Sequence, residues 1–157
     1  MENLSKMNKL NYPTWLVSLE IAKEFKGIGF DEPTLFHYYE NDFDVTVETN
    51  SYYDEGEAQG YLHFYISAFK EENFNRDKKC VSLPVWEQAL AWFRARGYKI
   101  AFKDINIGTQ CAFYHLDIKE GHTFSHFAKK YEKAREVLVM KLIEVHKEFG
   151  NNIKRFD

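Results

Sequence analysis

One stretch near the middle of the chain, LPVWEQALAWFRARGY from Leu83 to Tyr98, constrains the fold more than any other. Pro84 is expected to end a strand, because proline cannot donate a ladder hydrogen bond. The apolar residues that follow repeat at i, i+3, i+4 and i+7, the spacing of one helix face: Trp86, Ala89, Leu90 and Phe93. Gly97 stops this helix and leads the chain into a new strand. Trp92 lies at the edge of the apolar face, where we expect it to be able to contact a partner as well.

The rest of the chain is expected to complete a single domain of 157 residues, with residues 1–12 and 151–157 loose. Aromatic residues make up 17% of it, enough to build a large core. The start lacks the apolar segment of a signal peptide, and no apolar run approaches the roughly 18 residues that span a bilayer. We therefore expect a cytoplasmic protein without a membrane segment, whose Cys80 and Cys111 stay reduced.

The first half of the chain reads as one helix followed by strands. The helix is predicted over residues 18–28, with Ser18 as N-cap and Gly29 as a left-handed C-cap. Strands are predicted over residues 34–39, 43–49 and 61–69, the second of them by clean alternation of apolar and polar residues.

The second half adds a hairpin and a long helix to the central helix. Strands 98–103 and 110–118 are predicted to flank a turn at Asn106-Ile107-Gly108, and the last helix to cover residues 131–148. The resulting order, α-β-β-β-α-β-β-α, predicts an α+β domain with an antiparallel sheet and helices packed on one face.

Two helix ends share one pattern. Phe25-Lys-Gly-Ile-Gly-Phe30 and Phe93-Arg-Ala-Arg-Gly-Tyr98 both place an aromatic residue, a base, a glycine and a second aromatic residue at equal spacing. We interpret this as one way of ending a helix used twice.

Three fragments together resemble a known group of proteins. The segment 17–33 resembles an opening motif VSxExAKxLKxxGFDEP, the segment 84–98 resembles PTxxxAxxWLRE, and the segment 131–136 resembles the TYEEAxEA start of a closing helix. The chain is in this respect similar to small proteins without assigned activity from gut Bacteroidetes genomes and their phages or mobile elements. It departs from the motifs at Val85 and Lys130, where threonine would cap a helix. The resemblance implies an origin, and its motifs of caps and core residues carry no chemistry.

Charge is unevenly distributed. Residues 31–60 hold nine Asp or Glu and no Lys or Arg, although the whole chain has a net charge of only −3. This acidic window predicts either a solvated edge or a surface that mimics nucleic acid or docks on a basic protein partner. The residues expected to form that surface are Asp42, Asp44, Glu48, Asp54, Glu55 and Glu57.

The last helix carries a second apolar sector beside its main stripe. Val139, Met140 and Ile143 form this sector, which requires either a loop of the same chain or a second subunit to cover it. We therefore expect homodimerisation through it.

Histidines and tyrosines occur together in the predicted strands. If those strands are neighbours, one sheet face would carry His37, Tyr39, His63, Tyr65 and His115 and could stack on a flat ligand. The alternative is a half-wetted sheet face without a ligand. His122 and His126 have the i, i+4 spacing of a helical metal pair, but Gly121 disfavours a helix there, and we expect no metal site.

Motifs for known chemistry are missing. The chain has no GxSxG, P-loop or GxGxxG segment, so hydrolase and nucleotide-loop readings fail, and we expect no cofactor. Arg94, Arg96, Lys99 and Lys103 could meet phosphate, or simply complement the dipole of the central helix, and nucleic acid is not an expected partner. The sequence favours a non-enzymatic interaction or accessory protein of phage or mobile-element type, with a small ligand-binding protein or enzyme using the Tyr/His face as the alternative.

Overall fold

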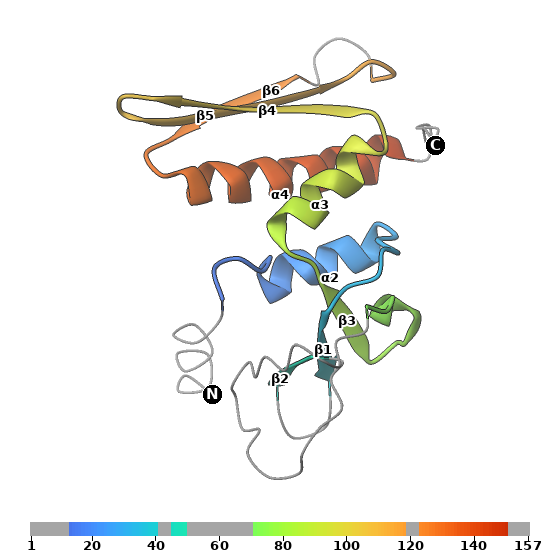
Figure 1. Cartoon of the computed structure of the whole chain (residues 1–157). Helices are drawn as coiled ribbons and strands as arrows, with labels where there is room; N and C mark the ends of the chain where they lie inside the picture. Colours follow the sequence, from blue (N-terminus) through green and yellow to red (C-terminus); the bar gives the residue numbers. More distant parts are fainter. Residues whose placement is uncertain (1–12, 41–44, 50–70, 119–122, 151–157) are drawn as a thin grey trace. The chain divides into compact units, whose positions relative to one another are not determined.

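The computed structural model describes residues 13–40, 45–49, 71–118 and 123–150 (Figure 1). For Glu40 and residues 45–49 it describes the backbone alone. The chain divides into two compact units, residues 1–86 and 87–157. In the described part of the chain, no helix combines the length and apolarity needed to cross a membrane.

The first unit consists of a helix and a small antiparallel sheet. Its elements are α2 (Leu19–Gly27), β1 (Phe36–Glu40), β2 (Val45–Thr49), the 3₁₀ turn η1 (Phe74–Arg76) and β3 (Cys80–Leu83). The strand order is β2-β1-β3, and β1 pairs antiparallel with both neighbours. Helix α2 packs on β3 through the buried face of Ile21, Ala22 and Phe25.

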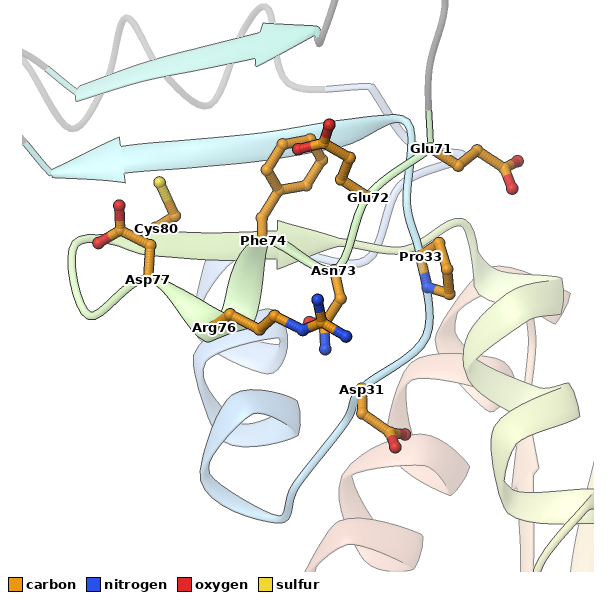
Figure 2. Close-up of a pocket in the computed structure, with 9 residues that line it drawn as sticks. All are labelled: Asp31, Pro33, Glu71, Glu72, Asn73, Phe74, Arg76, Asp77 and Cys80. Carbon is orange, nitrogen blue, oxygen red and sulfur yellow. The ribbon is translucent and has the colours of Figure 1, made fainter.

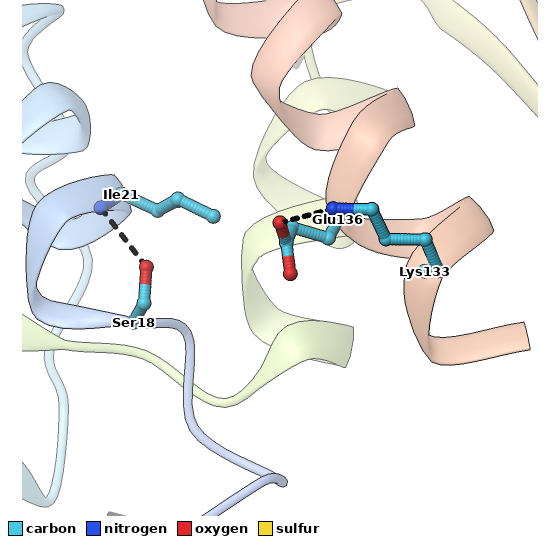
Figure 3. A network of polar contacts seen from close by, with 4 residues as sticks. All are labelled: Ser18, Ile21, Lys133 and Glu136. Carbon is cyan, nitrogen blue, oxygen red and sulfur yellow. Dashed lines mark hydrogen bonds and ion pairs between the residues drawn. The ribbon is translucent and has the colours of Figure 1, made fainter. Parts of the chain in front are cut away.

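The caps of α2 form as predicted. The Ser18 hydroxyl accepts a hydrogen bond from the Ile21 N–H at 3.3 Å, as Figure 3 shows. Gly29 has φ +87°, the left-handed conformation that glycine adopts without strain. The Phe30 N–H then reaches back to the Phe25 carbonyl at 3.0 Å, and the two rings meet edge to face. The helix therefore ends through local geometry that the sequence contains.

The second unit places two helices beside a three-stranded antiparallel sheet. Its elements are α3 (Trp86–Arg94), β4 (Tyr98–Ile105), β5 (Gly108–His115), β6 (Phe124–Ala128) and α4 (Tyr131–Phe149). The strand order is β4-β5-β6, and Figure 1 shows α3 and α4 on the same side of the sheet. Helix α4 packs on β5 and β6.

Helix α3 repeats the ending of α2. Gly97 also has φ +87°, and its N–H bonds to the Arg94 carbonyl at 3.0 Å. The rings of Phe93 and Tyr98 meet edge to face at 5.4 Å, compared with 5.3 Å for Phe25 and Phe30. The shared sequence pattern thus corresponds to one shared cap geometry.

Alternation in β5 defines the two faces of this sheet. Thr109, Cys111, Phe113 and His115 are buried, whereas the residues between them are exposed or half-buried. The inner face meets the main stripe of α4, which buries Ala134, Leu138, Leu142 and Val145.

The α+β class, the antiparallel pairing and the order of the predicted elements are confirmed. The strand predicted over residues 61–69 lies outside the described residues, and β3 is the strand that Pro84 was predicted to end. One strand, β6, was not predicted. Its period-2 pattern turns Phe124, His126 and Ala128 inward and leaves Ser125 and Phe127 outward, but the preceding Gly121 obscured it in the sequence.

Helix α4 begins without a side-chain cap. Lys130 occupies the N-cap position, with an extended backbone and no capping hydrogen bond from its side chain. This agrees with the departure from threonine seen in the sequence. One turn into the helix, Lys133 and Glu136 form an exposed ion pair at 3.1 Å (Figure 3). A pair this exposed contributes little to stability.

Candidate functional site

The predicted acidic surface falls largely beyond what the structure describes. Asp42, Asp44, Asp54, Glu55 and Glu57 lie outside the described residues. Glu48 lies in β2, where its backbone faces His37 across the ladder, and its side chain is not described. The hypothesis of an acidic docking surface therefore stays a prediction.

An open groove of about 690 Å³ lies in the first unit (Figure 2). Four carboxylates and one guanidinium line it, from Asp31, Glu71, Glu72, Asp77 and Arg76; the other lining residues are Pro33, Asn73, Phe74 and Cys80. It is open, its lining is mixed polar and apolar, and none of His37, Tyr39 and His115 lines it. A small-molecule site is typically more enclosed and more apolar than this groove.

A lysine holds the loop beside this groove. The Lys26 ammonium donates to the backbone carbonyls of Asp77, Lys78 and Cys80 at 2.6, 3.3 and 2.5 Å. Three carbonyl oxygens around one ammonium satisfy all its donors. Lys26 therefore fixes the turn that leads into β3 from the end of α2.

The hypothesis of one Tyr/His sheet face is wrong for the pair that can be placed. His37 and Tyr39 lie on β1, whose neighbours are β2 and β3, whereas His115 lies on β5 between β4 and β6. His37 and His115 therefore belong to different sheets. Residue types in a strand do not reveal which other strands it pairs with, so the sequence could not predict this. His63 and Tyr65 lie outside the described residues. The His37 ring stacks on Phe74, with centroids 4.2 Å apart.

His115 has a structural role that its contacts define. Its side chain is only 6% exposed, and its Nε2 lies 2.7 Å from the Arg96 carbonyl oxygen. Its Nδ1 accepts a hydrogen bond from the Asp117 N–H at 3.1 Å. A carbonyl requires a donor and an N–H requires an acceptor, so this ring is the neutral tautomer protonated at Nε2. His115 thus ties the end of β5 to the turn between α3 and β4.

A second histidine, the half-buried His146 of α4, was missed in the sequence. Its Nδ1 lies 3.0 Å from the Tyr98 hydroxyl. Burial raises the pKa of Tyr98, so this hydroxyl stays protonated and donates. Burial, and then the charge of Arg96, lower the pKa of His146 to about 4. The signal was its i, i+4 spacing from Leu142, which places it on the buried stripe of the last helix.

Trp92 belongs to the same cluster and does not face outward. Its side chain is 2% exposed, and its ring lies edge to face with His146 at 5.2 Å. The Arg96 guanidinium covers the ring at 3.6 Å and donates to the Trp92 carbonyl at 3.1 Å. The expectation that Trp92 could contact a partner is therefore not met, because a neighbour one helical turn away covers the indole.

The second apolar sector of the last helix is mostly buried as well. Val139 and Ile143 are 0% and 4% exposed, and only Met140 reaches the surface, at 54%. This burial removes two of the three residues that motivated a homodimer, since one exposed methionine is an ordinary surface feature.

His126, the described member of the candidate metal pair, and both cysteines lie in strands. His126 lies in strand β6 and not in a helix, so the spacing argument fails, and His122 lies outside the described residues. Among the described residues, no three His, Cys, Asp or Glu side chains are grouped to hold a metal ion. Both cysteines are free thiols. Burial raises the pKa of Cys111, whose sulfur lies 3.4 Å from the Ala134 carbonyl oxygen, so it is a protonated core residue.

The most distinctive surface of the described chain is the outer side of the second sheet. We call it the open sheet face and define it by the outward residues of three strands: Lys99, Ala101, Lys103, Ile105, Gln110, Ala112, Tyr114, Ser125 and Phe127. Helices α3 and α4 lie on the opposite side of this sheet (Figure 1). Tyr114 and Phe127 are 48% and 40% exposed on it. Large aromatic side chains at such exposure mark a surface suited to a partner.

The rows of the open sheet face differ in character. Pairing sets Lys99 beside Tyr114 in one row, and Lys103 beside Gln110 and then Phe127 in another. Between them runs a row of small residues, Ala101, Ala112 and Ser125. The two exposed rings, each with a lysine in its row, thus lie on either side of a row of small side chains.

Comparison with models of protein families, with curated protein sequences and with solved structures finds no match to this chain.

Proposed function

We propose that this protein is a non-enzymatic interaction protein and that the open sheet face is its binding surface. The observation that supports this most is the exposure of Tyr114 and Phe127 on a side of the sheet opposite to both helices of the unit. The histidine side chains of this unit that are described in most detail have structural partners: His115 bonds to a turn carbonyl and His146 to Tyr98.

The accessory role of phage or mobile-element type stays part of this proposal. It is supported by the resemblance of segments 17–33, 84–98 and 131–136 to the group of proteins named above. The acidic window of residues 31–60 would supply a second, separate surface. Segregated charge of this kind favours a protein that works by docking, since complementary surfaces raise the rate and specificity of association.

Site-specific photo-crosslinking tests the binding surface. A photoreactive amino acid would replace either Tyr114 or Met140, whose exposed fractions of 48% and 54% are closely matched. In cells of the organism that carries the gene, we expect crosslinked products from position 114 in clear excess over position 140, because α4 packs on the inner face. Equal yields from the two positions, or none from position 114, would contradict the proposal.

A further inference from the structure

We propose that the open sheet face binds single-stranded nucleic acid, with bases stacked on Tyr114 and Phe127 and phosphates beside Lys99 and Lys103. This inference rests on the proposed function, because it names the partner of the same surface. It goes beyond that proposal by assigning the chemistry of the partner and a role to each row of the face.

The charge of the open sheet face favours a polyanion. Its defining residues include two lysines and no carboxylate. The nearest acid on the same strands, Asp104, belongs to the inner row and accepts a hydrogen bond from the Thr109 hydroxyl at 2.7 Å. An incoming phosphate therefore meets ammonium groups without a competing carboxylate on that side of the sheet.

The charge of the unit points the same way. Residues 87–157 contain thirteen Lys or Arg against nine Asp or Glu, a net charge of +4, whereas residues 1–86 contain eight against fifteen, a net charge of −7. The chain total of −3 conceals this division. The net charge of the whole chain is therefore a poor guide to its partner, and the basic unit is the one that carries the open sheet face.

The two exposed rings lie at the spacing of separate bases. Tyr114 and Phe127 stand four residues apart along the ladder and on adjacent strands, since Gln110 is the partner of Phe127. That is roughly 13 Å along the sheet and about 4.8 Å across it. Each ring shares its row with one lysine, Lys99 or Lys103. Base stacking beside a backbone contact is the common mode of single-strand recognition on flat sheets.

The small residues between the two rings leave space for the backbone of a bound nucleic acid. Ala101, Ala112 and Ser125 form a row without any side chain longer than serine, so a nucleotide backbone could pass between the two stacking points. Ser125 accepts a hydrogen bond from the Gln110 amide at 3.2 Å, which lays the glutamine along the sheet. A duplex is disfavoured, because its bases are stacked on each other and cannot reach the rings.

Fluorescence anisotropy on the full chain tests the inference directly. The probes are labelled DNA and RNA single strands of about 12 nucleotides, within the range that single-strand folds cover, and a duplex of the same sequence. We expect the single strands to bind more tightly than the duplex. Comparing the affinities for DNA and RNA shows which of the two nucleic acids is preferred. Tyr114→Ala and Phe127→Ala should each weaken binding by roughly 5- to 150-fold, the measured range for loss of one stacked base.

The salt dependence separates the lysines from the rings. For single strands, each phosphate contact contributes about −0.7 to the slope of log K against log salt concentration. Lys99→Gln and Lys103→Gln should each reduce the slope by about that amount, and Tyr114→Ala should leave it unchanged. The matched controls are Lys141→Gln and Met140→Ala on α4, both expected to retain wild-type affinity. Circular dichroism confirms that each variant folds.

Two outcomes would overturn the inference. One is that neither the DNA nor the RNA single strand binds at low salt. The other is that Tyr114→Ala and Phe127→Ala both leave the affinity unchanged. The crosslinks from position 114 then show whether the proposed function also fails: products sensitive to nuclease support nucleic acid, products sensitive only to protease mean a protein docks there, and no products mean that both proposals are wrong.

Discussion

The roles of individual residues depend most on which hydrogen bond each side chain makes. His115 and His146 lie in the same unit, yet one donates to a turn carbonyl and the other accepts from a tyrosine hydroxyl. Both bonds require a neutral ring. His115 drew attention in the sequence because of its strand neighbours, and His146 did not, although burial lowers the pKa of His146. The sequence therefore drew attention to histidines as a residue type, but their hydrogen-bond partners in the folded chain determine their roles.

The pKa of His146 makes the stability of the protein depend on pH. The ring has a pKa of about 4 in the folded chain and an ordinary value of 6.5 when unfolded. Between these values only the unfolded chain binds the proton, so the free energy of unfolding falls as the pH drops from about 6.5 to 4. The slope from this group stays below the limit of about 1.4 kcal/mol per pH unit, because the ring is only half-buried and solvent screens it.

Urea unfolding of the wild type and of His146→Gln at several pH values measures this effect. Glutamine keeps an acceptor for the Tyr98 hydroxyl but does not titrate, so we expect the variant to lose less stability between pH 6.5 and 4.5. An NMR titration of the His146 ring should give a midpoint near pH 4. Equal pH slopes for the two proteins, or a midpoint near 6.5, would contradict this account.

At the scale of helices and strands, local rules explain most of what forms. Helices α2 and α3 end through the same sequence pattern, with Gly29 and Gly97 both at φ +87°. Such caps involve about five consecutive residues, so sequence reasoning found them. Strand β6 was missed because it has only five residues, and pairing with β5, not propensity, establishes a strand so short.

Gly27, the last residue of α2, and Gly29, just beyond its C-cap, provide a matched test of the cap. A Cβ at either Gly27 or Gly29 would meet no atom within 4 Å, but only Gly29 has a positive φ. We therefore expect Gly29→Ala to lower the free energy of unfolding by about 1–2 kcal/mol, the cost of the left-handed conformation. Gly27→Ala should raise it by about 0.5–1 kcal/mol, since alanine stabilises a helix.

The measurement is the urea midpoint at constant m-value for both variants. The two changes should shift the midpoint in opposite directions. Destabilisation of similar size by both would show that space beside the helix, and not backbone conformation, controls its end.

For the whole molecule, the two compact units differ in charge and in architecture. The first is acidic and holds a small sheet with α2, and the second is basic and pairs a larger sheet with α3 and α4. The second unit has a set of buried side chains of its own, among them Tyr98, Phe113, Leu138 and Leu142. A core built from one helix stripe and one sheet face is the usual basis of an independent domain.

A fragment of residues 84–157 should therefore fold alone. We expect helical and strand signals in circular dichroism and a cooperative thermal transition, with modest stability because a unit of this size has a limited core. Leu142→Ala in the fragment should cost about 2–5 kcal/mol and abolish or strongly weaken the transition, since Leu142 is fully buried. A fragment without any cooperative transition would show that the second unit depends on the first.

The sequence by itself determined the helices, their caps, the hairpin at Asn106-Ile107 and the α+β class, because periodicity and cap chemistry are local properties. Only the tertiary structure decided that Trp92, Val139 and Ile143 are buried and that Tyr114 and Phe127 are exposed on one face. Exposure depends on which distant element covers a side chain, and a sequence pattern records that a residue is apolar without recording what packs on it. The central stretch from Leu83 to Tyr98 could thus be recognised as core in advance, whereas the open sheet face emerged only when three strands paired.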